Sequence, residues 1–301
     1  MVDASIIIPC YNQGEFLKDS VGSALAQTFK DCEVMVVDDG SDDEKTKAAI
    51  SKLPPQVRVL WTENRGLPAA RNHGIAAAAG EFICCLDADD MLHRDYIGRT
   101  VAALKGDASV EYGIVTTGVR NFGVETGSWR ILGFDPVRLL LGNCLHVASL
   151  FRKRCWEEVG GYDETLAGYQ DWEFWISIVE KGYKWACIED ELFLRRCRAG
   201  SMLSCSDTMR DKLMTQIVTK HLDFYSRHMV SIMVEADRAN RQMAAELSVL
   251  KRTRAVRLAD ILAKSVSSWR GLLLAPFRIA KLCVPDLLKD KVKARADRTA
   301  R

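Results

Sequence analysis

The chain has 301 residues, of which 48% are hydrophobic and 27% are charged. This balance is typical of a folded globular protein and excludes a disordered chain. The net charge of +2 hides an asymmetry, because residues 251–301 carry 14 Lys/Arg against 4 Asp/Glu, whereas residues 1–250 carry 28 against 36. At roughly 100–200 residues per domain, the length suits one large acidic domain with a basic appendage.

The cysteines and the apolar runs indicate the cellular compartment of the protein. The ten cysteines form no CxxC pair and no Cys/His cluster with the spacing of zinc ligands. Residues 1–5 lack a signal-peptide pattern, and no apolar run approaches the ~20 residues that span a bilayer. We therefore expect a cytoplasmic protein with reduced thiols.

Short buried strands alternate with helices through the first ninety residues. Apolar runs predict strands at residues 5–9, 33–37, 57–61 and 81–86, and helical spacing predicts helices at 15–29 and 67–79, with a Lys- and Ala-rich helix between the second and third strands. The short connections favour an open, mostly parallel α/β sheet. Residues 110–200 look like mixed strands and loops, and residues 207–250 have the spacing of long helices.

Two of the predicted strands end in acidic clusters. Asp38 and Asp39 close the second strand, and residues 87–90 (DADD) close the fourth. Ligands bind outside the carboxyl ends of such strands. Two carboxylates one residue apart can share a hard divalent cation with diphosphate oxygens, and Asp38 with Asp39 can accept from a base or a ribose. The alternatives are a solvated turn at 87–90 and an N-cap for the helix after Asp39.

Four motifs in register resemble family 2 glycosyltransferases: residues 5–12 (SIIIPCYN), 37–41 (VDDGS), 66–75 (GLPAARNHGI) and 86–90 (LDADD). The resemblance covers about residues 4–204 and implies the GT-A fold, a Rossmann-like, mostly parallel sheet flanked by helices. We expect residues 1–206 to form this catalytic domain and residues 207–301 to form a helical, basic, amphipathic C-terminal extension.

The resemblance also implies a role for each matching residue. Arg71 would face the diphosphate, although a salt bridge to the acidic strand ends is the alternative. Asp87 and Asp89 would hold Mn²⁺ or Mg²⁺, with Asp89 the more direct ligand. Tyr11 would lie near the base, and Asp39 at the uracil or the ribose. The full set implied to bind the nucleotide sugar is Pro9, Tyr11, Asp38, Asp39, Arg71, Asp87, Ala88 and Arg198.

The remaining motif departs from the family pattern in two places. The family shows Glu-Asp, with the Asp as general base, where this chain has Gln170-Asp171. Asp171 is therefore the implied base, and an N-cap role is the alternative. Many relatives carry a His where this chain has Arg198. An arginine cannot ligate a cation but can pair with phosphate, so the expected third protein ligand of the metal is missing.

We therefore expect an inverting glycosyltransferase that moves a sugar from a nucleoside diphosphate donor to a hydroxyl acceptor. The expected donor is a UDP-sugar, and the expected context is surface polysaccharide or glycolipid synthesis. The departures at Gln170 and Arg198 keep open an inactive nucleotide-sugar-binding or scaffold protein. A nucleotidyltransferase would need a Gly-rich basic loop after the first strand, which residues 10–14 do not supply.

The basic tail allows two interpretations. Lys and Arg side chains surround an apolar face that includes Trp269 and Phe277, which suits an interfacial helix at the inner face of the membrane. The same pattern suits a helix packed on the catalytic domain or on a second subunit of a homo-oligomer. We expect no nucleic-acid partner, because no recognition motif accompanies the charge.

Overall fold

The computed structural model describes residues 2–106, 110–198 and 209–251. The chain divides into two compact units, Met1–Ile232 and Met233–Arg301. The boundary expected at residues 206/207 and the basic tail from residue 252 onward lie outside the described residues. Among the helices that the structure describes, none is long and apolar enough to cross a membrane.

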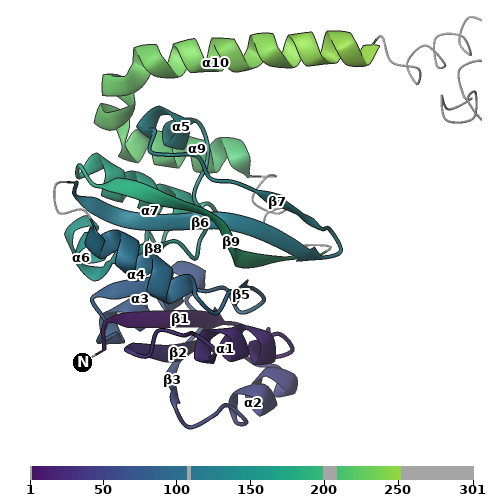
Figure 1. The fold of residues 1–301 in the computed structure, drawn as a ribbon, viewed down its shortest axis with the longest axis vertical. Helices are drawn as coiled ribbons and strands as arrows, with labels where there is room; N and C mark the ends of the chain where they lie inside the picture. Colours follow the sequence, from purple (N-terminus) through teal and green to yellow (C-terminus); the bar gives the residue numbers. More distant parts are fainter. Residues whose placement is uncertain (1, 107–109, 199–208, 252–301) are drawn as a thin grey trace, which may run out of the picture. The chain divides into compact units, whose positions relative to one another are not determined.

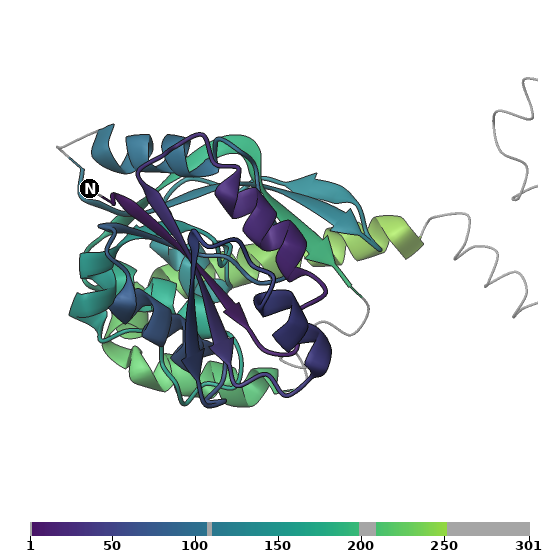
Figure 2. The ribbon, with the colours of Figure 1, turned by 90° about the horizontal axis from the view of Figure 1, so that it is seen from below.

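The N-terminal part of the first unit is a parallel sheet with helices on both faces. Strands β1 (Ala4–Cys10), β2 (Cys32–Asp39), β3 (Val57–Thr62) and β4 (Phe82–Cys85) lie in the order β3-β2-β1-β4. They are connected by α1 (Leu17–Leu25), α2 (Glu44–Ile50) and α3 (Leu67–Ala77). The chain moves from β1 to β3 in one direction and then returns to β4. Right-handed crossovers therefore place α1 and α2 on one face and α3 on the other (Figure 2).

The sheet continues beyond β4 with mixed strand directions (Figure 1). Strand β8 (Leu150–Arg152) runs antiparallel to both β4 and β6 (Tyr112–Gly123), and β6 pairs in parallel with β9 (Lys184–Cys197). Beyond these strands, β5 (Met91–Leu92) pairs with β9 and β7 (Gly127–Trp129) pairs with β6, both antiparallel. Four helices accompany these strands: α4 (Tyr96–Gly106), α5 (Pro136–Leu141), α6 (Lys153–Val159) and α7 (Gln170–Glu180).

The predicted strands of the first ninety residues are all present, and the α/β fold class is confirmed. Strand β1 is buried along its whole length, as expected for a parallel strand covered on both faces. Helix α3 packs closely on β1 and β2 through Gly74, where a Cβ atom would overlap Cγ2 of Ile7. This close approach fixes the helix that carries Arg71.

The helical pattern predicted for residues 207–250 corresponds, from residue 209 onward, to two helices. Helix α9 (Arg210–Lys220) is capped by His221, and α10 (Leu222–Lys251) follows at once. The apolar side chains Leu213 and Ile217 of α9, and Phe224 and Tyr225 of α10, are buried in the core of the first unit. Helix α9 and the start of α10 are therefore built into the same unit as the sheet.

Candidate active site

The acidic segment after β4 is held by arginines from two different elements. Arg71 on α3 donates to Oδ1 of Asp87 at 2.8 Å, and Arg198, just after β9, pairs with Oδ2 of Asp89 at 2.6 Å. Burial raises the pKa of Asp89, and the neighbouring Asp87 adds to the rise, whereas Arg198 opposes it. Packed carboxylates repel one another, so the segment requires positive partners.

Arg71 occupies a buried position. Its side chain is 2% exposed, and its guanidinium lies 5.4 Å from the centre of the Tyr162 ring. The neighbouring Asn72 fixes the segment that carries Tyr162, because its Oδ1 accepts from the Tyr162 amide at 2.8 Å and its Nδ2 donates to the Tyr162 carbonyl at 2.9 Å. The salt-bridge alternative for Arg71 is thus present, and it places the positive charge directly against Asp87.

A third arginine, Arg196 on β9, also shapes the acidic segment and was not among the residues predicted from the sequence. The backbone amide of Arg196 donates to Oδ1 of Asp90 at 2.7 Å, and its Nε donates to the carbonyl of Asp89 at 2.8 Å. Its terminal nitrogen pairs with Asp19 on α1 at 2.7 Å. Asp90 is 5% exposed, and burial, followed by repulsion from Asp87 and Asp89, raises its pKa well above the usual range.

Asp171 lies in the first turn of α7 and is close enough to the acidic segment to interact with it. Burial raises the pKa of Asp171; Arg71 is the largest opposing influence, and Asp87 adds to the rise. Its Oδ2 accepts from Nδ2 of Asn143 at 2.9 Å. The fold thus brings Arg71, Asp87 and Asp171 together from α3, the loop after β4 and α7.

The N-cap alternative for Asp171 is wrong. The N-cap of α7 is Tyr169, which adopts a left-handed conformation with φ 56° and ψ 25° and makes no side-chain cap hydrogen bond. Such a conformation is strained for an aromatic residue and is characteristic of functional segments. It lets the chain enter α7 so that Asp171 follows two residues later.

Asn143 was not predicted from the sequence either, because it follows α5 in an exposed loop with no motif around it.

The expected nucleotide end lies at the carboxyl ends of β1 and β2. Asp39 accepts from the backbone amides of Arg65 and Gly66 at 3.0 and 2.9 Å, so it fixes the loop that leads into α3. Asp38 accepts from the amide of Ser41 at 3.1 Å. Gly40 has φ +70°, and a Cβ atom there would lie 2.7 Å from the amide nitrogen of Asn64. This turn therefore requires glycine.

The remaining predicted contacts differ in exposure. Pro9 is buried near the end of β1, whereas Tyr11, after that strand, is 44% exposed and its ring is accessible to a ligand. Ala88 is 1% exposed between the two carboxylates. The short Ala88 side chain therefore packs inward, while Asp87 and Asp89 remain partly exposed.

The acidic segment offers a partial set of metal ligands. Among the described residues, no three His, Cys, Asp or Glu side chains form a group that could hold a metal ion. Asp87 and Asp89 supply two carboxylates, and each is already paired with an arginine. Two carboxylates suit Mg²⁺ or Mn²⁺ when phosphate oxygens and water complete the coordination sphere. The residues present therefore fit a cation that binds together with a diphosphate.

Residues 5–158 match the family described as Glycosyl transferase family 2. An uncharacterized glycosyltransferase of Rickettsia conorii is 32% identical over 186 residues, covering 58% of this chain and 31% of that protein. The chondroitin synthase of Escherichia coli is 29% identical over 186 residues, covering 59% of this chain and 26% of that protein. The chain thus spans about a third or less of these relatives.

Solved structures share the fold at low sequence identity. S. aureus TarS residues 1–349 in complex with UDP-GlcNAc has a TM-score of 0.58 and 19% identity, covering 67% of this chain and 60% of that one. The mannosyltransferase PcManGT of Pyrobaculum calidifontis, in complex with GDP-Man and Mn²⁺, has a TM-score of 0.55 and 18% identity, covering 92% and 86%. These similarities establish the GT-A fold.

Proposed function

Because this chain belongs to glycosyl transferase family 2 and is a glycosyltransferase, we propose that it moves a sugar from a UDP-sugar donor to a hydroxyl acceptor with inversion at the anomeric carbon. The observation that carries the proposal is that Asp171, in the first turn of α7, interacts electrostatically with the salt-bridged pair Arg71 and Asp87. Arg198 and Asp89 extend the same cluster.

Asp171 is the proposed general base. It takes the proton of the acceptor hydroxyl while the hydroxyl oxygen bonds to the anomeric carbon from the face opposite the diphosphate. The bond from the anomeric carbon to the donor phosphate breaks at the same time, and the nucleoside diphosphate leaves with the bonding electrons. Burial raises the pKa of Asp171, which makes its carboxylate a stronger base than a solvated one. Asn143 orients the carboxylate by donating to Oδ2.

The proposed leaving-group site is the acidic segment with its arginines. Asp87 and Asp89 would hold Mn²⁺ or Mg²⁺ together with the donor diphosphate, and the cation would supply positive charge to the leaving phosphate. Arg198 pairs with Asp89 and is the second proposed source of positive charge at this site, since a guanidinium can pair with phosphate directly. Arg71 holds Asp87 in place from the buried side.

The proposed nucleotide site is the end of β1 and β2. Tyr11 presents an accessible ring to the base, Asp38 and Asp39 face the uracil or ribose, and Pro9 and Ala88 form the packed floor. The similarity to the chondroitin synthase of Escherichia coli supports an acceptor in surface polysaccharide or glycolipid synthesis. We propose action in the cytoplasm at the inner face of the membrane.

The test is a panel of nucleotide sugars incubated with the purified protein and Mn²⁺, in which nucleoside diphosphate release is followed with and without EDTA. We expect release from one UDP-sugar that EDTA abolishes. Asp89→Ala should abolish release, and Asp171→Asn should reduce it by about 10²–10⁴-fold, the usual range for a general base. The exposed Asp31→Asn variant, before β2, is the control.

The alternative, an inactive nucleotide-sugar-binding or scaffold protein, makes a different prediction. UDP would then bind to the wild type with measurable affinity, no donor would turn over with any hydroxyl acceptor, and Asp171→Asn would change neither quantity. A protein that binds no nucleotide at all would contradict both functions.

A further inference from the structure

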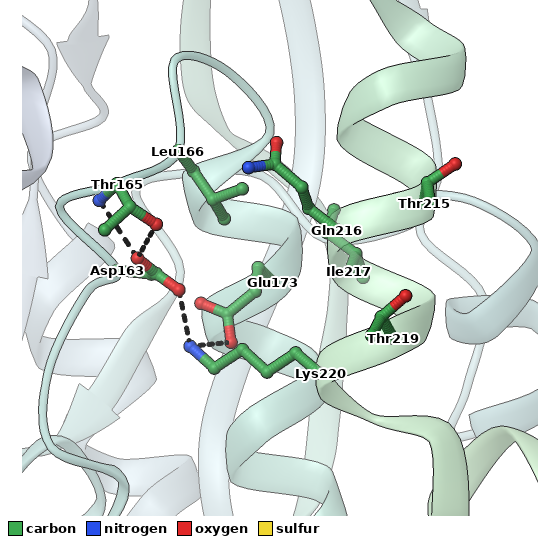
Figure 3. A pocket seen from close by; sticks show the side chains of 9 residues that line it. All are labelled: Asp163, Thr165, Leu166, Glu173, Thr215, Gln216, Ile217, Thr219 and Lys220. Carbon is green, nitrogen blue, oxygen red and sulfur yellow. Dashed lines mark hydrogen bonds and ion pairs between the residues drawn. The ribbon is translucent and has the colours of Figure 1, made fainter.

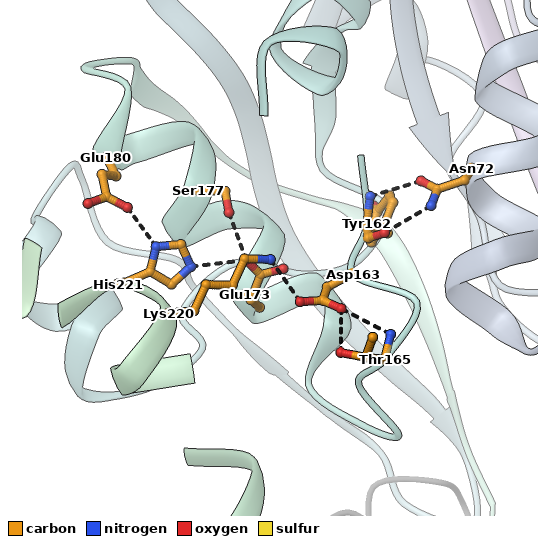
Figure 4. Close-up of polar contacts among 9 residues, drawn as sticks. All are labelled: Asn72, Tyr162, Asp163, Thr165, Glu173, Ser177, Glu180, Lys220 and His221. Carbon is orange, nitrogen blue, oxygen red and sulfur yellow. Dashed lines mark hydrogen bonds and ion pairs between the residues drawn. The ribbon is translucent and has the colours of Figure 1, made fainter. Parts of the chain in front are cut away.

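A buried ionic cluster joins α7 to the end of α9 (Figure 4). Glu173, two residues after Asp171, is 0% exposed. One of its oxygens, Oε1, contacts Nε2 of His221 at 3.0 Å and Nζ of Lys220 at 2.9 Å, and accepts from Oγ of Ser177 at 2.8 Å. A buried carboxylate is costly unless it is paired and hydrogen-bonded, so the cations of α9 are what allow Glu173 to lie there charged.

The two cations bind further acids around the same helix. Lys220 also pairs with Asp163 on the loop before α7 at 2.8 Å, and Nδ1 of His221 contacts Glu180 at the end of α7 at 2.6 Å. Arg227 on α10 lies 3.6 Å from the other oxygen of Glu180. Contacts at the first turn, at the last turn and on the preceding loop therefore fix α7 against α9 at three points.

The charges of the cluster agree with this arrangement. Burial favours a higher pKa for Glu173, but the hydrogen bonds from His221 and Lys220 outweigh it and leave the pKa lowered. Burial favours a lower pKa for His221, but the hydrogen bonds to Glu173 and Glu180 outweigh it and leave the pKa raised. Both shifts favour the charged pair, and charged hydrogen bonds are the stronger kind.

Side-chain packing between the loop and α9 is incomplete beside this cluster. A hollow of about 380 Å³ opens there, lined by Asp163, Thr165 and Leu166 of the loop, by Glu173, and by Thr215, Gln216, Ile217, Thr219 and Lys220 of α9 (Figure 3). Beside this hollow, Lys220 pairs with both Asp163 and Glu173, so its ionic contacts connect the loop and α7 to α9 at this point.

The start of α10 contacts α5, the helix that precedes the hydrogen-bond partner of the base. The hydroxyl of Tyr225 donates to the carbonyl of Leu140 on α5 at 3.0 Å, and Nε1 of Trp172 on α7 donates to the carbonyl of Leu139 at 2.6 Å. Helix α5 ends at Leu141 and leads directly into Asn143, the residue that donates to Asp171. Contacts from α9 and α10 therefore reach α7, the helix that carries the base, and α5, the helix that leads into its hydrogen-bond partner.

We propose that α9 and the start of α10 form a clamp that positions the general base: Lys220 and His221 fix α7 through Glu173, and Tyr225 fixes α5 behind Asn143. The assignment of Asp171 as base rests on the proposed function, whereas the clamp itself is a statement about α5 and α7. Lys220, His221 and Tyr225 are positioning residues, since none of them touches Asp171.

The test uses mild variants of the full chain. Lys220→Met removes a charge from a side chain that is 43% exposed, and Tyr225→Phe removes a single hydroxyl. Lys220→Arg restores the charge, and Lys212→Met on the exposed side of α9 is the matched control. Amide hydrogen exchange in the first turn of α7, kcat for donor turnover, and the Kd for UDP are measured on each protein.

We expect Lys220→Met combined with Tyr225→Phe to speed exchange in the first turn of α7 and to lower kcat by on the order of 10–100-fold, because small displacements of a reacting group are costly. The Kd for UDP should stay within about 2-fold, since a general base acts on the acceptor side. Lys220→Arg in place of Lys220→Met should recover most of the kcat that Lys220→Met loses, because the charge is kept. Lys212→Met should match the wild type.

Unchanged exchange in the first turn of α7 would overturn the clamp, as would a loss of UDP affinity equal to the loss of kcat. If the wild type turns over no donor, the proposed function fails, and hydrogen exchange still decides the clamp without any turnover.

Discussion

At the scale of single residues, the carboxylate of Asp171 lies between opposing influences. Burial and the nearby Asp87 raise its pKa, while Arg71, the backbone amide of Trp172 and the Asn143 side chain lower it. Of these groups, Asn143 is the exposed one, so it can be changed without opening the core. A substitution of Asn143, on the loop after α5, should therefore change the pKa of Asp171.

Replacing Asn143 with alanine should move the low-pH side of the activity profile upward. The lost hydrogen bond stabilised the carboxylate, so the pKa of Asp171 rises and less of it is ionised at a given acidic pH. The lost hydrogen bond is worth about 0.5–1.5 kcal/mol, so the acidic limb of the profile should move measurably upward. The measurement is kcat/KM against pH for wild type and Asn143→Ala, and an unchanged acidic limb would contradict the role of Asn143.

Arg198 should contribute directly to donor affinity. It pairs with Asp89 and lies 4.6 Å from the centre of the Phe16 ring, so its guanidinium is held beside the proposed diphosphate site. Losing one charged hydrogen bond costs about 1.5–3 kcal/mol, which predicts a roughly 10–100-fold weaker Kd for UDP in Arg198→Ala. Calorimetry at fixed Mn²⁺ checks this. Arg94→Ala, on an exposed loop, is the control, and equal affinities would exclude the contact.

At the scale of elements, the position of α3 depends on its close approach to the sheet. Gly74 lies against Ile7 of β1 with no room for a Cβ atom, whereas Gly22, inside α1, has nothing within 4 Å of the same position. A Cβ atom would therefore overlap the sheet at Gly74 but would meet open space at Gly22.

Alanine at these two positions should change stability in opposite directions. Gly74→Ala should lower the free energy of unfolding by about 1–3 kcal/mol, because overpacking displaces α3 or the sheet. Gly22→Ala should raise it by about 0.4–1 kcal/mol, because alanine restricts the unfolded chain and fits the helix. Urea unfolding of both variants beside the wild type measures the pair, and destabilisation by both would show that α1 is also tightly packed at Gly22.

The sequence predicted those elements whose signal is local. Apolar runs located β1 to β4, and Asp38, Asp39, Asp87 and Asp89 were assigned to strand ends because each follows such a run directly. Asn143, Arg196 and Lys220 carry no local signal. Each reaches the site or its support through a partner at least 28 positions away, so only tertiary packing reveals it. The break between α9 and α10 was missed because apolar spacing continues through His221.

At the scale of the whole molecule, the first compact unit extends to Ile232. A chain ending at residue 232 should therefore keep the unfolding temperature and UDP affinity of the first unit. A chain ending at residue 206 loses the buried Leu213, Ile217, Phe224 and Tyr225. At about 1.5–3 kcal/mol for each buried side chain, that loss is comparable to the whole stability of a domain, which is roughly 5–15 kcal/mol.

Thermal unfolding and UDP binding of the two truncated chains test this. We expect the chain ending at residue 206 to be unfolded or to melt far below the chain ending at 232. Equal melting temperatures would mean that the sheet needs neither α9 nor the start of α10.

The order of these segments along the chain has a consequence for synthesis. The last strand of the sheet ends at Cys197, whereas Lys220, His221 and Tyr225 follow more than twenty residues later. At roughly 5–20 residues per second, a ribosome needs one to several seconds to add them. During that interval the nascent sheet still lacks the buried side chains of α9 and of the start of α10. Donor binding and turnover would therefore both begin only once α9 and the start of α10 have docked.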